Sequence, residues 1–376
     1  MRKFVSLMFI VSMLFLTLMA GIIDEAIKNS EIVQNKIKEL NLYWSAGGNI
    51  EFFKKFEKFN PTFDEVLKKL CGTRVLPEDY KGKLFNYLRM LSNGMRGMQP
   101  FGMTTTDDLI MGSLVLAKPE SVLDSYFYRL EPVRDQMFHG SCWAFSTIGS
   151  FESAYAIQVL NKDEGNVDNE LDFSERWVAY HNIDWDIYTF SLYELIQDKN
   201  SLEGGNPYFA MFNATRYGEI KEEYAPYSEV FLTADEVIPL PAQAFGAPRY
   251  KSSKTLIIPS APDAKALGYG YDEYISMIKS AIKNYGSLSV VYYVLNDFAS
   301  YTHGVYTPTT DIIAGAHAVT LVGWASLEDL DDIVLSEKTN PDATPVLDTE
   351  PSTFVYYDPT RGKTYTADLF WIVKNS

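Results

Sequence analysis

A cysteine with the surroundings of a reactive thiol lies in the first half of the chain. Apolar residues follow Cys142 at helical spacing, namely Ile148, Phe151, Tyr155 and Leu160. This pattern predicts an amphipathic helix that begins close to Cys142. Free backbone N–H groups and the positive end of a helix dipole favour a thiolate, which is the nucleophilic form of cysteine. The sequence therefore predicts a nucleophile here, although an isolated cysteine is more often a buried, inert thiol.

The neighbours of this cysteine form a longer motif. Gln136 lies six positions before Cys142, Gly140 and Ser141 come directly before it, and the run 143–145 reads Trp-Ala-Phe. This run resembles the papain-like cysteine peptidases, in which a glutamine and five further residues precede Cys-Trp-Ala-Phe. The resemblance implies hydrolysis of peptide bonds by Cys142. It also implies that the Gln136 amide and the Cys142 backbone N–H form the oxyanion hole.

The resemblance also assigns the base and the residue that orients it. His317 begins an apolar strand-like run in the family order, and Asn375 follows near the end of the chain. His317 would share the thiol proton and later protonate the leaving amine, while Asn375 would hold its other ring nitrogen. The chain has four histidines. We expect His139 to be a loop residue, and His181 and His303 to be exposed on the surface.

A substrate groove is implied in the same way. Gly204 and Gly205 would let a peptide backbone approach and pair with the main chain. Pro207, Tyr208 and Ala316 would line the pocket for the second residue before the cleaved bond. Because these side chains are mostly apolar, we expect a hydrophobic or aromatic residue in that pocket. We expect no cofactor and no metal.

The remaining patterns predict the elements around these residues. Residues 22–70 are helix-rich, and residues 274–283 form a short helix. Residues 287–294 are typical of a core strand, and residues 369–374 of another strand. Ser174 is a candidate helix N-cap. The resemblance implies an α+β, two-lobed fold with the active site in the cleft between a helical lobe and a β-barrel-like lobe.

Composition indicates a globular protein. Of 376 residues, 47% are hydrophobic, and the net charge is −16. This charge disfavours nucleic acids and anionic membrane surfaces as partners. Residues 1–20 are typical of a signal peptide, since Arg2 and Lys3 precede an apolar run that is short for a membrane anchor. We therefore expect export, to a secreted, periplasmic or extracellular location, without a stable membrane anchor.

The order of parts predicts a precursor. Residues 21–120 would be a helical propeptide and connector, followed by a helical lobe at 121–235 and a β-rich lobe at 236–376. In the papain family such a segment runs through the cleft in reverse and blocks it, so the expected partners are peptide or protein substrates and the chain's own propeptide. Cys71 falls in this segment, where we expect a small buried apolar residue.

Two features depart from the family pattern. Residues 326–366 form an acidic insertion, which reads as a solvated loop rather than a cation site because its acids lack the spacing of an EF-hand. The family continues past Asn-Ser with Trp-Gly, whereas this sequence stops at Ser376. The alternative function is therefore a non-catalytic peptide-binding homologue that has lost activity with its C-terminal segment. A transglutaminase-like acyl transferase also uses Cys and His, but the spacing from Gln136 to Cys142 argues against it.

Overall fold

The computed structural model describes most of the chain. The described residues are 21–59, 61–76, 78–94, 114–120, 126–127, 133–161, 171–182, 202, 204–232, 239–326, 354–367 and 369–376. The predicted signal peptide and most of the acidic insertion lie outside these residues. The chain divides into two compact units, one made of 1–69, 293–315 and 326–370 and the other of 70–292, 316–325 and 371–376.

The smaller unit is built around a long N-terminal helix. Its elements are α2 (Ile22–Leu40), β1 (Trp44–Ala46), α3 (Ile50–Glu57), α4 (Phe63–Leu70), η5 (Asn296–Ser300), β6 (Tyr301–Gly304), β8 (Phe354–Asp358) and β9 (Lys363–Ala367). Strand β1 pairs antiparallel with β6, and β8 pairs antiparallel with β9. Ile37, Leu42 and Trp44 form the buried centre of this unit. The helix-rich prediction for residues 22–70 is confirmed.

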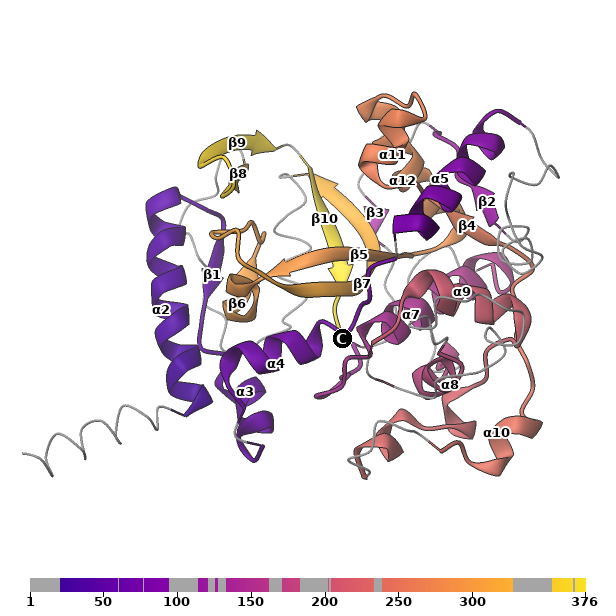
Figure 1. The fold of residues 1–376 in the computed structure, drawn as a ribbon, viewed down its shortest axis with the longest axis horizontal. Coiled ribbons are helices and arrows are strands. Elements are labelled where there is room, and N and C mark those ends of the chain that lie inside the picture. The colour runs from indigo at the N-terminus through magenta and orange to yellow at the C-terminus, as the bar shows by residue number, and fades with distance from the viewer. Residues whose placement is uncertain are drawn as a thin grey trace, which may run out of the picture. The chain divides into compact units, whose positions relative to one another are not determined.

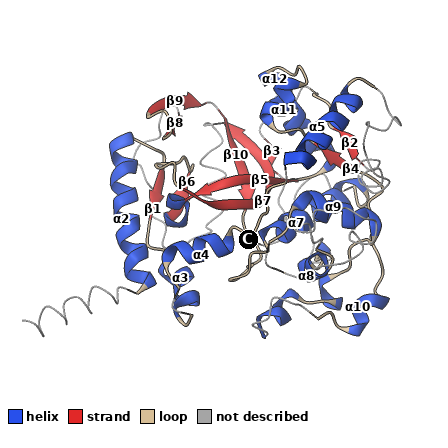
Figure 2. Ribbon diagram, in the orientation of Figure 1, coloured by secondary structure: helices blue, strands red, loops and turns tan. Residues whose placement is uncertain are grey.

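The larger unit contains most of the helices (Figures 1 and 2). Its helical elements are α5 (Glu78–Ser92), α7 (Cys142–Gln158), α8 (Glu175–Tyr180), α9 (Pro207–Arg216), η3 (Glu222–Tyr224), η4 (Tyr227–Leu232), α10 (Ala242–Gly246), α11 (Ala261–Ala266) and α12 (Tyr271–Tyr285). Helix α7 contacts α8, α9 and α12. The predicted cap at Ser174 is confirmed, because its side chain accepts a hydrogen bond of 3.1 Å from the Trp177 N–H.

The remaining elements are strands. They are β2 (Leu114–Leu116), β3 (Tyr126–Phe127), β4 (Thr255–Ile257), β5 (Leu288–Leu295), β7 (Ile313–Ser326) and β10 (Leu369–Lys374). One sheet has the order β10-β7-β3, with β5 also paired to β7, and β2 pairs in parallel with β4. Strand β5 forms as predicted, but it is not a core strand, because Val291 and Tyr293 are 45% and 55% exposed.

Helix α7 differs from the amphipathic helix that its sequence suggested. Ile148 and Phe151 are buried as expected, but Thr147, Glu152 and Ser153 on other faces are buried too. These polar side chains bond internally; the Thr147 hydroxyl, for example, donates to the Trp143 carbonyl over 2.7 Å. Helix α7 is therefore a helix of the protein core, and the residues packed around it fix the position of its first residue, Cys142.

Candidate active site

Cys142 is the first residue of α7 and is fully buried. The N-cap residue Ser141 makes no side-chain bond to the first-turn amides; its hydroxyl lies 2.7 Å from that of Tyr227. No acidic side chain lies in the first turn of α7. The positive end of the helix is therefore not offset by a capping oxygen, and it favours a negative charge at Cys142.

His317 lies on β7 beside this thiol, and the two groups change each other's pKa. Burial alone would raise the pKa of Cys142, but the charge of His317 and hydrogen bonds with His317, Thr73 and the Ala318 backbone lower it overall. Burial alone would lower the pKa of His317, but the charge of Cys142 and hydrogen bonds with Cys142, Asn375 and the Leu70 carbonyl raise it overall. These opposite shifts favour a thiolate–imidazolium pair.

Asn375 fixes the imidazole from its other side. The distance from His317 Nε2 to Asn375 Oδ1 is 2.7 Å. Strand β10 lies next to β7 in the sheet, and Asn375 follows directly after β10. Because an amide oxygen can only accept, Nε2 carries a hydrogen. The neutral ring then has its lone pair on Nδ1, which is buried. This nitrogen is available to exchange a proton with the thiol.

Gln136 has both ends of its amide held. Its Nε2 donates to the His139 carbonyl at 2.8 Å and to the Leu70 carbonyl at 3.2 Å. Its Oε1 accepts from the Ser376 hydroxyl at 2.8 Å. The amide N–H groups are therefore directed at carbonyl oxygens, and one of these belongs to a residue far earlier in the chain.

That earlier residue begins a segment, Leu70–Arg74, which runs along the predicted substrate groove. Gly72 bridges to Ala316 and Thr73 bridges to Gly205, both in parallel. The Thr73 N–H donates to the Ala316 carbonyl over 3.1 Å, and the Arg74 N–H to the Gly205 carbonyl over 2.7 Å. The Gly205 N–H donates to the Gly72 carbonyl over 3.0 Å. The segment thus occupies the main-chain donors and acceptors that a substrate strand would need.

Two residues of this segment approach the thiol closely. Thr73 Oγ1 lies 3.3 Å from Cys142 Sγ. Gly72 packs so tightly on Gly140 that an added Cβ would lie 1.8 Å from the Gly140 carbonyl oxygen. Only glycine fits at this position without a backbone shift.

The predicted pocket residues lie around the same segment. Gly204 has a φ of +82°, and a Cβ on Gly205 would lie 2.4 Å from the Trp143 ring. Pro207 is buried in the first turn of α9. Tyr208 is half-buried and packs edge-on against Tyr80, with ring centroids 5.8 Å apart. Gly204 therefore has a backbone conformation that other residues rarely adopt, and a side chain at Gly205 would clash with Trp143.

Sequence reasoning missed several residues of the site. Thr73, Leu70 and Asn206 all contact it, and the Asn206 side chain donates to the Arg74 carbonyl over 2.8 Å. Cys71 is half-exposed rather than buried, and it lies between two residues that touch the site. The sequence signal that could have indicated these residues is the run Cys71-Gly72-Thr73, which directly follows the helix-rich residues 22–70. The surface prediction for His181 was wrong: it is 6% exposed and stacks on Tyr217 at a centroid distance of 4.2 Å.

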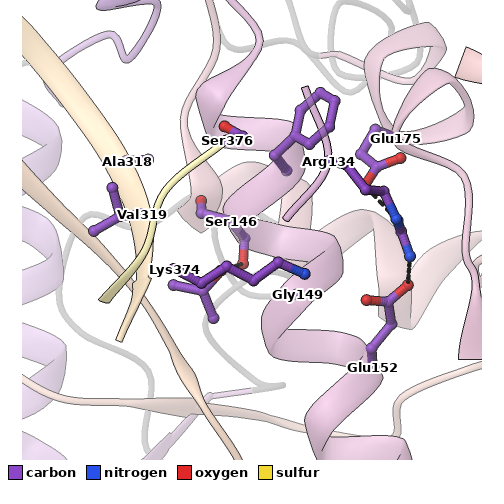
Figure 3. Close-up of a pocket in the computed structure, with 11 residues that line it drawn as sticks. Arg134, Ser146, Gly149, Glu152, Glu175, Ala318, Val319, Lys374 and Ser376 are labelled. Atoms are coloured by element: carbon purple, nitrogen blue, oxygen red, sulfur yellow. Dashed lines mark hydrogen bonds and ion pairs between the residues drawn. The ribbon is translucent and has the colours of Figure 1, made fainter. Parts of the chain in front are cut away.

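A separate small cavity lies along α7 and contains neither Cys142 nor His317 (Figure 3). Arg134 lies at its wall, 2.6 Å from Glu152 and 2.5 Å from Glu175. Burial raises the pKa of Glu152 to about 7 despite the guanidinium, and it also raises the pKa of Glu175. This group is a buried ionic network behind the site rather than a substrate pocket.

The described residues show two further absences. None of their His, Cys, Asp and Glu side chains form a group of three or more that could hold a metal ion. None of their helices has the length and apolarity needed to cross a bilayer.

A buried thiol at a helix start, beside an imidazole held by an amide, suits thiol-dependent hydrolysis. Residues 122–376 match the family described as papain family cysteine protease. The chain therefore belongs to the papain family of cysteine proteases, and it is a cysteine-type peptidase with the mixed helix-and-sheet fold of that family.

The chain is also similar to named relatives and to solved structures. The chain is 26% identical to a cathepsin B-like protein, CP2, of Giardia intestinalis, over 88% of this chain and 90% of the relative. It is 25% identical to cathepsin B of Dictyostelium discoideum over 54% of this chain and 58% of the relative. It also resembles the structure of procathepsin B S9 from Trypanosoma congolense, with a TM-score of 0.47, 18% identity and coverage of 78% and 82% of the two chains.

Proposed function

We propose that this chain is the inactive precursor of a peptidase that uses Cys142 as nucleophile, His317 as general acid and base, and Asn375 as the residue that orients the imidazole. The observation that carries the assignment is the position of the His317 ring. Its Nε2 is held 2.7 Å from Asn375 Oδ1, and its charge lowers the pKa of Cys142. This is the arrangement that a thiolate–imidazolium pair requires.

The chemistry follows from these positions. The Cys142 thiolate attacks the carbonyl carbon of the scissile peptide bond, and the Gln136 Nε2 and Cys142 N–H donate to the oxyanion that forms. The imidazolium of His317 gives its proton to the leaving amine, which departs and leaves an acyl group on the sulfur. Neutral His317 then takes a proton from water, whose oxygen attacks the thioester. The carbon–sulfur bond breaks, the carboxylic acid product leaves, and Cys142 and His317 remain as thiolate and imidazolium.

The precursor state is supported by the segment Leu70–Arg74. The Leu70 carbonyl oxygen accepts from Gln136 Nε2, which is the donor assigned to the oxyanion, and Thr73 covers the thiol. Helix α5 continues this segment and packs through Tyr80 on Tyr208 and Phe209. We therefore assign residues 21–120 to a propeptide, with the peptidase parts at 121–235 and 236–376. We further propose export by the signal peptide and a preference for a hydrophobic residue in the pocket of Tyr208 and Ala316.

The test is hydrolysis of a fluorogenic peptide with a hydrophobic residue two positions before the cleaved bond. The precursor is first processed by limited proteolysis in the segment 94–118, whose sequence predicts an extended connector. Cys142→Ser and His317→Ala should abolish turnover, while Gly246→Ala, whose added Cβ would meet nothing within 4 Å, should leave it unchanged. Peptide binding without hydrolysis in the processed wild type would instead support the non-catalytic homologue.

A further inference from the structure

The chain contains two cysteines, and the fold brings both to the same groove. Thr73 Oγ1 lies 3.3 Å from Cys142 Sγ, and Cys71 precedes Thr73 by two positions. Gly72 and Thr73 pair as a strand does, and side chains two positions apart in a strand point to the same side. Cys71 directly precedes this paired run, so the fold brings it to the same part of the groove.

The ionisation of the two thiols is also linked. Burial and the negative charge of Cys142 together raise the pKa of Cys71 to about 12. The charge of one thiolate is thus felt at the other, which requires that they lie near each other. Tyr292 is affected by both thiols, so the three groups share one region of the site.

The backbone on each side of Cys71 is held in place. The Leu70 carbonyl is bound by Gln136, and the Gly72 carbonyl by the Gly205 N–H over 3.0 Å. Two extended residues span about 7 Å, so Cys71 cannot lie far from the atoms that Thr73 touches. A disulfide needs Cα atoms about 4.4–6.8 Å apart, so the link requires the Cα atoms of Cys71 and Cys142 to reach that separation. Gly72, which has no side chain, leaves this approach unobstructed.

We propose that Cys71 and Cys142 form a disulfide in the precursor, which makes the propeptide a covalent, redox-controlled inhibitor; this inference rests on the proposed role of Cys142 as nucleophile. The oxidant is a low-molecular-weight disulfide such as glutathione disulfide. Cys71, which is partly exposed, loses its proton, attacks one sulfur of glutathione disulfide and expels a glutathione thiolate. The Cys142 thiolate then attacks the Cys71 sulfur and expels the second glutathione thiolate. The net reaction converts two protein thiols and one glutathione disulfide into one protein disulfide and two glutathione molecules.

This link changes what activates the enzyme. A cut in the connector 94–118 would separate the inhibitory segment from the peptidase part in sequence but not in space, because the disulfide would still tether Cys71 to Cys142. Activation would then require both proteolysis and a reductant. Reduction would regenerate the Cys142 thiolate and release the segment in one step.

The experiment uses the full chain, equilibrated with glutathione disulfide and analysed by peptide mass mapping without reduction. The expected result is a linked pair of peptides that contain Cys71 and Cys142, lighter by two hydrogen atoms than their sum, which disappears on reduction. Cys71→Ser and Cys142→Ser should each lack it. The matched control is Cys71→Ser/Asn93→Cys: this places a cysteine at an exposed position just past the far end of α5, where no link to Cys142 should form.

Activity supplies the second readout. After oxidation and a cut in the connector, the wild type should show less than about a tenth of the activity that it has after treatment with a reductant. Cys71→Ser should need only the amount of reductant that removes a glutathione adduct from Cys142. Glutathione adducts or intermolecular dimers without the linked pair would overturn the proposal. Loss of hydrolysis in reduced Cys71→Ser would instead count against the proposed function. The Cys71–Cys142 disulfide is detected by peptide mass mapping, which does not depend on turnover.

Discussion

The hydroxyl of Thr73 lies 3.3 Å from the sulfur of Cys142, although the two residues are 69 positions apart. This contact places an N-terminal segment directly on the proposed nucleophile, and it helps to lower the pKa of Cys142. The segment therefore covers the proposed catalytic residues, Cys142 and His317, which already lie beside each other. It blocks access without disrupting the geometry, so removal of the segment exposes a site that needs no rearrangement.

Loss of this hydroxyl should change the ionisation of the precursor. In a Cys71→Ser background Cys142 is the single cysteine, and its thiolate can be titrated by absorbance near 240 nm. Thr73→Val keeps the side-chain shape but removes the hydrogen bond to the thiolate, so the pKa of Cys142 should rise in the precursor. After processing, the two proteins should titrate alike. An unchanged precursor titration would contradict the role given to Thr73.

The groove contact of Gly72 should be essential for latency. A Cβ at Gly72 would lie 1.8 Å from the Gly140 carbonyl oxygen, so Gly72→Ala should displace the segment. We expect unprocessed Gly72→Ala precursor to hydrolyse a fluorogenic peptide at least about tenfold faster than wild type, which corresponds to a loss of about 1.4 kcal/mol of inhibition. Gly82→Ala is the control, because its Cβ meets nothing within 4 Å. Equal latency of the two variants would exclude this explanation.

The dependence of kcat/KM on pH should be bell-shaped. Below the lowered pKa of Cys142 the thiolate is protonated, and above the raised pKa of His317 the imidazolium is lost, so activity falls on both sides. The Asn375 hydrogen bond helps to raise the pKa of His317. Asn375→Ala should therefore move the alkaline limb to lower pH and reduce kcat/KM by about 10- to 100-fold, because the ring is free to rotate. A reduced rate with an unshifted alkaline limb would show that Asn375 acts in another way.

Buried carboxyl groups should make the fold less stable as pH rises. Burial raises the pKa of Glu152 to about 7, of Glu219 to about 8 and of Glu222 to about 9, all from 4.5. A carboxyl whose folded pKa lies above its unfolded value stabilises the fold fully below the unfolded value, and this contribution is lost as pH rises towards the folded value. We expect Tm at pH 8 to be about 5–10 °C below that at pH 5.

Glu219 provides the specific test of this explanation. Both of its carboxylate oxygens are buried without a hydrogen-bond partner among the described residues, and the attraction of Arg249 does not offset the burial. Glu219→Gln removes the ionisable group while keeping its size, so its Tm should fall less between pH 5 and pH 8 than that of the wild type. A parallel decrease in both proteins would assign the effect to other groups.

The sequence by itself determined the local features of this protein. The Gln136–Cys142 spacing and the following apolar residues indicated a thiol at a helix start, and α7 begins at Cys142. The strand pattern at His317 and the run before Asn375 predicted β7 and β10, and Ser174 is the cap that its type suggested. These features depend on residues close together in the chain, where periodicity and capping preferences act directly.

Only the tertiary structure decided which distant residues meet. It placed Leu70 against Gln136, 66 positions away, and it set Cys71 and Thr73 beside the thiol. It also buried His181 and most faces of α7, which local polarity had suggested would be exposed. Such contacts form between segments with no shared periodicity, and the burial of a side chain depends on what packs on it rather than on its neighbours in sequence. The occupied groove is therefore a property of the fold, not of any motif.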